Sequence, residues 1–206
     1  MRKLNGFLLL SAFLSGCAGQ APYDYTAYHR SNPSSILIMP PVNHTVDIKA
    51  PYGVMSQLSM PLAEAGYYVF PVSVVDETFK RNGVTTPDDA AGIPYQKLRQ
   101  IYGADAALYT SVERYGTSYM VVASNTTVAL NARLVDLRNG VTIWEGSSNF
   151  INENNGLIGA LLNQIISSAS DASFPVAGAA ANQLLDAHSD RGILLGPRAP
   201  NYGQQK

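Results

Sequence analysis

A two-residue alternation of apolar and polar side chains dominates the middle of the chain. One face of this stretch carries Val128, Leu130, Ala132 and Leu134, and the other carries Thr127, Asn131 and Arg133. Successive side chains of a strand point to opposite faces, so the pattern predicts a strand with one buried face. Asn139-Gly140 then predicts a tight turn, with a return strand from Val141 that places Ile143 and Trp144 on opposite faces. The chain must therefore contain an antiparallel hairpin.

Shorter elements precede this hairpin. Apolar runs at 36–39 and 68–72 and an alternating run at 106–112 predict three strands. Helical spacing predicts helices over 52–66, 75–80 and 95–102, with Pro61 either kinking the first or starting its second half, and the turn-forming residues of 84–94 predict a loop. The order of elements favours an α+β fold, a single domain with a mixed sheet flanked by helices.

Two helices are expected after the hairpin. The first spans 156–168, where Leu157, Leu161 and Ile165 fall on one apolar stripe and no charge occurs between Glu153 and Asp171. Such a stripe is the ordinary mark of a helix packed on a sheet, and the alternative is an interface with a partner subunit or a membrane pore. The second spans 176–187 and is rich in alanine.

The N-terminus has the order of a secretory signal peptide. Arg2 and Lys3 precede a short apolar run that ends at Leu14-Ser15-Gly16-Cys17. The run is well below the roughly 20 residues of a transmembrane helix. These last four residues resemble the lipobox of bacterial lipoproteins, which implies cleavage after residue 16 and a diacylglycerol thioether on Cys17. The alternative is a structural cysteine, and Ala18 in place of aspartate implies the outer membrane.

The remaining boundaries follow from composition. Residues 17–34 contain Pro22, Pro33 and several tyrosines without apolar periodicity, which predicts a lipidated N-terminus and flexible tether. The tyrosines could lie at the lipid headgroups or pack on the domain. The α+β domain is expected over 35–190, and the glycines and prolines of 191–206 predict a flexible tail.

Composition and motifs exclude several kinds of chemistry. With 14 basic and 15 acidic residues the chain has a formal charge of -1, which offers no broad surface for nucleic acid, and one cysteine excludes an internal disulfide. No nucleotide loop or serine-nucleophile elbow occurs, and His29, His44 and His188 lack metal-ligand spacing. We therefore expect no catalytic residues, no metal and no cofactor. The charges of Glu113, Arg114, Arg133 and Glu145 are expected to form cross-strand pairs.

Three segments resemble envelope lipoproteins. Residues 36–43 resemble the opening strand and proline-asparagine element of the curli pore lipoprotein CsgG and its relatives. Residues 102–106 resemble the point in those proteins where a helix leads into a strand, and 132–136 with Gly140 and Trp144 resemble their hairpin. Over nearly the whole chain the order better resembles a family of bacterial lipoproteins that includes a meningococcal vaccine-candidate antigen. Its members are often encoded beside a CsgG-like protein. The resemblance implies a fold similar to the N-terminal domain of TolB, and no established activity.

These observations support two functions. The first is a non-enzymatic, outer-membrane-anchored lipoprotein facing the periplasm, an accessory or scaffold in envelope assembly, secretion or transport, with a CsgG-like protein or further copies of itself as partner. The second is a binding module for a small envelope ligand, a glycan or peptidoglycan fragment. A concave site with tyrosines and convergent polar groups would favour the second function.

Overall fold

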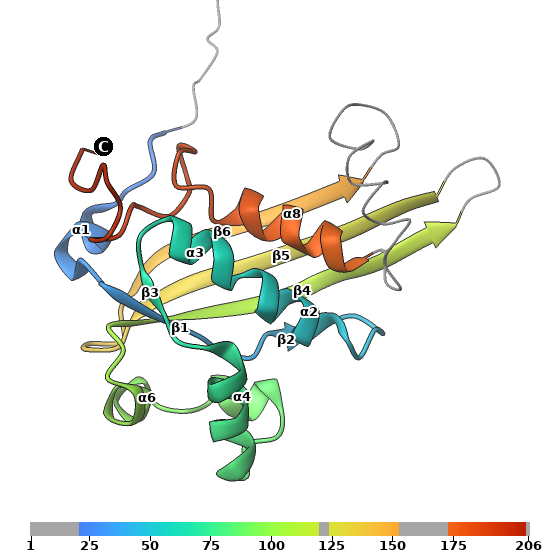
Figure 1. Cartoon of the computed structure of the whole chain (residues 1–206), viewed down its shortest axis with the longest axis horizontal. Helices are drawn as coiled ribbons and strands as arrows, with labels where there is room; N and C mark the ends of the chain where they lie inside the picture. The colour runs from blue at the N-terminus through green and yellow to red at the C-terminus, as the bar shows by residue number, and fades with distance from the viewer. Residues whose placement is uncertain (1–20, 120–123, 153–172, 205–206) are drawn as a thin grey trace, which may run out of the picture.

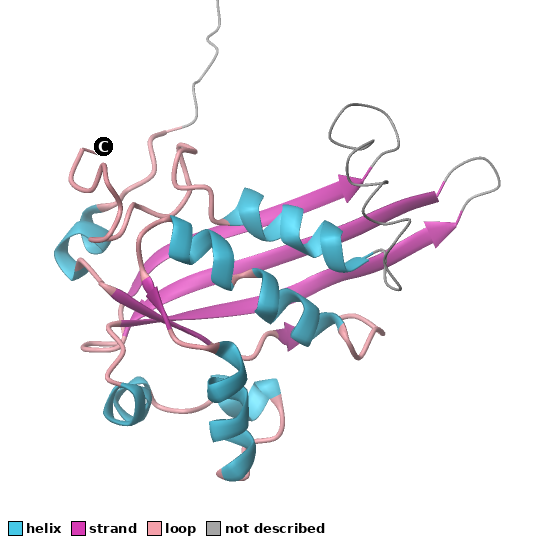
Figure 2. Cartoon of the chain, viewed as in Figure 1, coloured by secondary structure: helices cyan, strands magenta, loops and turns pink. Residues whose placement is uncertain are grey.

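The computed structural model describes residues 21–119, 124–152 and 173–204, which form a single α+β domain around one mixed sheet (Figures 1 and 2). Six strands are paired in the order β3-β1-β4-β5-β6, with β2 also paired to β4. Their bounds are β1 Ser35–Ile38, β2 Val42–Asn43, β3 Tyr68–Val69, β4 Ala106–Tyr119, β5 Ser124–Asp136 and β6 Thr142–Asn152. The α+β class and the three strands predicted ahead of the hairpin are confirmed.

The predicted hairpin, β5 with β6, forms the antiparallel end of this sheet. β4, β5 and β6 run antiparallel, whereas β1 is parallel to both β3 and β4. The turn between β5 and β6 places Gly140 at φ 77°, and the N–H of Gly140 donates to the carbonyl of Asp136 at 2.8 Å. Leu134 faces Trp144 while Val135 faces Thr142, so Ile143 is an extra residue in β6. This bulge allows both Ile143 and Trp144 to be buried.

Helices cover the sheet and its parallel edge. They are α1 Thr26–Ser31, α2 Ala50–Gln57, α3 Ser59–Glu64, α4 Val72–Arg81, α5 Pro87–Ala91, α6 Tyr95–Tyr102 and α8 Ser173–Leu184. In Figure 1, α2, α3 and α8 lie across one face of the long strands, and α4 and α6 lie beyond β1. Pro61 falls in the first turn of α3, so it starts the second half of the predicted helix.

The prediction that 84–94 is only a loop is wrong. Residues Pro87–Ala91 form α5, because the hydroxyl of Thr86 accepts a hydrogen bond from the N–H of Asp89 at 3.1 Å. Pro87 follows at the first helical position, where its missing N–H costs nothing. The capping residue and the proline were both visible in the sequence, and they outweigh the turn-forming character of the segment.

Helix α8 packs closely on the long strands because it presents alanines and because β6 presents Gly146 beside the ring of Trp144. Ala177, Ala180 and Ala181 of α8 are fully buried. A Cβ added to Gly146 of β6 would lie 2.4 Å from the ring of Trp144 and 3.3 Å from Leu184. The predicted helix 176–187 is present with earlier bounds, and the predicted helix 156–168 lies outside the described residues.

The two segments predicted to be flexible, a tether and a tail, both pack on the domain. Tyr28 of α1 is 2% exposed, and its hydroxyl lies 2.7 Å from that of Tyr67, which donates to the carbonyl of Leu194 at 2.6 Å. The N–H of Gly196 donates to the carbonyl of Ala65 at 2.7 Å. Of the places considered for the tyrosines, packing on the domain is the one observed. Residues 1–16 and 17–20 lie outside the described residues.

Candidate functional site

The residues predicted to carry function fall outside the described part of the chain. This applies to the lipobox Leu14, Ser15 and Gly16, to Cys17, and to the candidate interface positions Leu157, Leu161 and Ile165. Among the residues that the structure does describe, no cluster of histidine, cysteine or acidic side chains could hold a metal ion. Within the same residues, none of the helices is long and apolar enough to cross a bilayer. The candidate functional surfaces described below all lie on the α+β domain.

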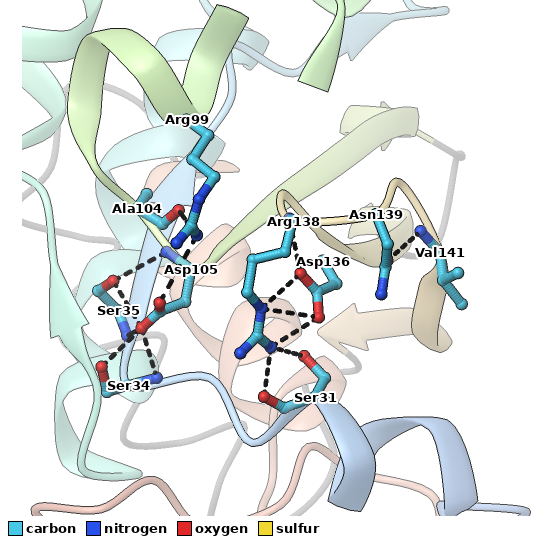
Figure 3. A network of polar contacts seen from close by, with 10 residues as sticks. All are labelled: Ser31, Ser34, Ser35, Arg99, Ala104, Asp105, Asp136, Arg138, Asn139 and Val141. Atoms are coloured by element: carbon cyan, nitrogen blue, oxygen red, sulfur yellow. Dashed lines mark hydrogen bonds and ion pairs between the residues drawn. The ribbon is translucent and has the colours of Figure 1, made fainter. Parts of the chain in front are cut away.

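A polar network joins the strand ends at the base of the sheet (Figure 3). Asp105 precedes β4, and its Oδ2 accepts hydrogen bonds from the N–H and hydroxyl groups of Ser34 and Ser35, between 2.6 and 3.2 Å. Arg99 Nη1 lies 3.9 Å from Oδ1 of Asp105. Burial alone would raise the pKa of Asp105, but these hydrogen bonds together hold it below the usual value. Asp105 thus ties β1 to the start of β4.

Asp136 forms the second half of this network. Its buried carboxylate accepts hydrogen bonds from Nε of Arg138 at 2.9 Å, from Nη2 at 2.6 Å and from the backbone N–H of Arg138 at 2.7 Å. Nη2 of Arg138 also donates to the carbonyl and the hydroxyl of Ser31 at the end of α1. Burial acts to raise the pKa of Asp136, yet the bonds from Arg138 and Ser31 leave it lowered.

The network is a structural clamp. Every carboxylate in it is engaged by donors from neighbouring segments, and the N–H of Leu137 donates to the carbonyl of Asp105 at 2.8 Å, which links the two halves. A catalytic acid or base would need access to a substrate, and Asp136 is 1% exposed. Asp105 and Asp136 lie in segments on which the resemblance to CsgG-like proteins rests, so in this chain those segments serve the fold and not a catalytic reaction.

A groove of about 640 Å³ crosses β4, β5 and β6. Its floor holds two rows of side chains that the register places on one sheet face, Tyr109–Arg133–Glu145 and Ser111–Asn131–Ser147. Gly146 and Trp144 point to α8, so these rows face away from α8. Pro40, Val42 and Ala91 form one wall, and Arg191 stands at the other end. This concave surface contains exposed polar groups.

Two arginine-tyrosine stacks flank the groove. The guanidinium of Arg133 lies 4.3 Å from the ring centre of Tyr109, and that of Arg191 lies 5.3 Å from the ring centre of Tyr23. Burial raises the pKa of Tyr109, and the charge of Arg133 opposes this shift. Arg133 lies directly opposite Glu145 in the register, but within the described ranges neither it nor Arg191 has a carboxylate within 4.0 Å.

The expected charge pairing across the strands is therefore wrong in detail. Glu113 is the extra residue of a bulge in β4, which turns its carboxylate toward His44 at 3.1 Å, the hydroxyl of Ser111 at 2.6 Å and the amide of Asn131 at 3.2 Å. These donors hold the pKa of Glu113 below its usual value, with Ser111 contributing most. Sequence reasoning missed the bulge, because the alternation that predicted this strand ended at 112, one residue before the inserted Glu113.

The outer edge of β6 is a second surface without a described partner. The N–H of Glu145 points away from β5, because it donates to the hydroxyl of Tyr23 at 2.8 Å. The register is regular from Trp144 to Asn152, so the N–H and carbonyl groups of Ser147, Asn149 and Ile151 also point outward. Residues 146–152 contain no charge and no proline, the usual devices that protect a strand edge.

The fold indicates the class of protein to which this chain belongs. A mixed sheet with a long antiparallel hairpin and a C-terminal helix is an α+β domain type that occurs in a bacterial lipoprotein of known structure. The chain belongs to the family described as "Putative lipoprotein GNA1162-like", whose model matches residues 23–198. The lipoprotein NMB1124/NMB1162 of Neisseria meningitidis serogroup B is 48% identical over 195 residues, covering 90% of this chain and 91% of that protein. The family predicted from the sequence is confirmed.

Solved structures agree with this assignment. The crystal structure of lipoprotein GNA1162 from Neisseria meningitidis is 46% identical, with a TM-score of 0.57, and covers 66% of this chain and 97% of that one. A dodecameric PelC from Paraburkholderia phytofirmans has the same fold, with 13% identity and a TM-score of 0.50 over 79% of this chain and 91% of that one. These likenesses confirm the predicted fold class.

Proposed function

We propose that this lipoprotein is a non-enzymatic scaffold or accessory of an envelope assembly, held at the outer membrane by a lipid on Cys17 with its domain facing the periplasm. Its partners are further copies of itself or a CsgG-like envelope protein, as the family resemblance implies. The family membership and the lipobox at Leu14–Cys17 support the anchor. Acyl chains contribute about 0.8 kcal/mol per buried CH₂, so a multiply acylated N-terminus remains on the bilayer.

The observation that carries the assembly role is the open edge of β6. Ser147, Asn149 and Ile151 present outward backbone groups on a strand of 11 residues that carries no protecting charge beyond Glu145. An extended segment of another protein can pair there through backbone hydrogen bonds. PelC, which shares the fold, is described as a dodecamer, so this architecture is compatible with assembly of copies.

The test is a crosslinking pull-down of the membrane-extracted, acylated protein. We expect an envelope partner or a homo-oligomer in the wild type, and its loss in Cys17→Ala, which cannot be anchored. Asn149→Pro should also abolish it, because proline removes an N–H that points outward and leaves the ladder to β5 intact. Asn149→Thr keeps the N–H and is the matched control.

Two results would overturn this proposal. Recovery of the wild-type protein alone, as a monomer, would exclude the scaffold role. Equal capture by Asn149→Pro and Asn149→Thr would exclude the β6 edge as the docking surface. The thermal unfolding midpoint of each variant shows that any loss of capture is not a loss of folding.

The alternative function, a binding module for a small envelope ligand, is favoured by one specific observation. The groove over β4, β5 and β6 combines a concave shape with the ring of Tyr109 and polar side chains, which is the kind of arrangement that such a module requires. Binding of a soluble saccharide by the purified protein tests this function separately from assembly.

A further inference from the structure

The groove holds two arginine side chains, Arg133 and Arg191, on a chain with a formal charge of -1. The charged side chains that line it are Arg133, Arg191 and Glu145, and at its margin the carboxylate of Glu113 is engaged by Ser111, Asn131 and His44. Charge of one sign gathered in a concave site attracts ligands of the opposite sign. The groove therefore favours an anion.

The two guanidinium groups are held in place without being neutralised. Arg133 lies over the ring of Tyr109, and Arg191 lies over the ring of Tyr23. The backbone carbonyl of Arg191 also accepts a hydrogen bond from Nε1 of Trp144 at 2.9 Å, which fixes its position beside β6. Stacking on a ring uses the face of a guanidinium and leaves its N–H donors, which lie in its plane, available to a carboxylate or phosphate.

The size of the groove and its other lining residues indicate what kind of molecule carries the anionic group. A groove of about 640 Å³ is far larger than a single inorganic anion requires. Ser147 supplies a hydroxyl group, and the carbonyl oxygen of Asn131 is available because its amide donates to Glu113. These groups match a ligand that carries many hydroxyls, as a sugar does, better than an apolar side chain.

Glu145 limits how much negative charge the ligand can carry. Glu145 stands on β6 beside both stacks, since it is paired with Arg133 in the register and its backbone N–H donates to the hydroxyl of Tyr23. A second acidic group placed over Glu145 would be repelled, whereas a sugar hydroxyl can donate to it. The groove thus suits one acidic group per bound sugar unit.

From these observations we infer that the groove binds a sugar that carries one carboxylate or phosphate, with Arg133 and Arg191 as its anion-binding residues. This inference rests on the second candidate function and is independent of the assembly role. The ligand lies across β4 to β6 on the sheet face away from α8, with its acidic group against the N–H donors of Arg133 and Arg191 on the side away from Glu145, and its hydroxyls toward Glu145 and Ser147.

The experiment compares pairs of probes that differ only in charge. Dissociation constants are measured by ligand-observed NMR titration on the full-length protein in a detergent without a sugar headgroup. Cellobiouronic acid is compared with cellobiose, and glucose 6-phosphate with glucose. We expect each acidic probe to bind about tenfold more tightly than its neutral partner, the difference made by one charge-assisted contact, and the tighter of the two acids identifies carboxylate or phosphate as the natural group.

Variants locate the binding. Arg133→Gln and Arg191→Gln should each weaken the acidic probe about tenfold and leave the neutral probe unchanged. Arg114→Gln is the matched control, since Arg114 is an exposed arginine of β4 that does not line the groove. Fluorescence of Trp144, the single tryptophan, verifies folding.

The outcomes separate the ligand class from the function on which it rests. Equal binding of acidic and neutral probes would overturn the anionic ligand while leaving a saccharide-binding module in place. An equal effect of Arg133→Gln and Arg114→Gln would overturn the assignment of the groove. Failure of all four probes to bind would overturn both the inference and the second candidate function.

Discussion

Replacement of Asp136 by asparagine tests the clamp at the base of the sheet. The side chain of Asp136 is 2% exposed and accepts three hydrogen bonds from Arg138. Asparagine keeps the shape but removes the charge, and it can accept through one oxygen only. Breaking a buried ion pair costs about 3–5 kcal/mol. The side chain of Arg138 is 39% exposed and can be rehydrated, so we expect a loss of about 2 kcal/mol.

The assay is thermal unfolding of the purified protein followed by circular dichroism. A loss of about 2 kcal/mol corresponds to a midpoint lower by about 4–8 °C for a chain of this length. Asp88→Asn is the control, because Asp88 is an exposed aspartate in α5. The reasoning is refuted if Asp136→Asn unfolds within 1 °C of the wild type.

The dependence of this difference on pH follows from the direction of the pKa shift. The pKa of Asp136 is lower in the folded state than in the unfolded chain. Its ionised form therefore stabilises the fold above the unfolded pKa of about 3.9, and this contribution is lost as the pH falls through the folded pKa. The asparagine variant does not titrate there. The difference between the two proteins should be full at pH 7 and should narrow below about pH 4.

Two further predictions concern the packing of the C-terminal segment, and both are measured by urea unfolding. Tyr67→Phe removes the hydroxyl that donates to the carbonyl of Leu194, and we expect a loss of about 1–2 kcal/mol, whereas an unchanged midpoint would show that this bond does not hold the segment. Gly66→Ala places a Cβ 2.3 Å from the backbone nitrogen of Ala199, whereas Gly83→Ala, also at positive φ, meets nothing within 4 Å. Gly83→Ala should lower the free energy of unfolding by about 1 kcal/mol from backbone strain alone, and Gly66→Ala should lower it clearly more. Equal losses would contradict the close contact between Gly66 and Ala199.

The sequence was sufficient for elements whose pattern is local. The hairpin needs only alternation and Asn139-Gly140, and helix α6 has the predicted bounds because Pro94 and Gly103 limit it on both sides. The groove could not be predicted in this way. Tyr109 and Arg133 lie on different strands, and their contact depends on a register that a bulge at Glu113 and another at Ile143 modify. Bulges change which residues share a face without changing composition.

Residues 21–34, predicted to be part of a flexible tether, pack on the domain through contacts that are distant in the sequence. The hydroxyl of Tyr23 accepts a hydrogen bond from the N–H of Glu145, 122 residues further along the chain. The hydroxyl of Tyr28 contacts that of Tyr67, 39 residues away, and Tyr67 in turn donates to the carbonyl of Leu194. No local pattern can reveal such contacts, because they join segments that are distant in the sequence. With the proposed lipid on Cys17, only residues 18–22 remain before Tyr23, and at about 3.5 Å per residue they span roughly 20 Å. An anchor at Cys17 would therefore hold the part of the domain that contains Tyr23 and Arg191 near the bilayer surface, and a ligand of the groove would be bound there.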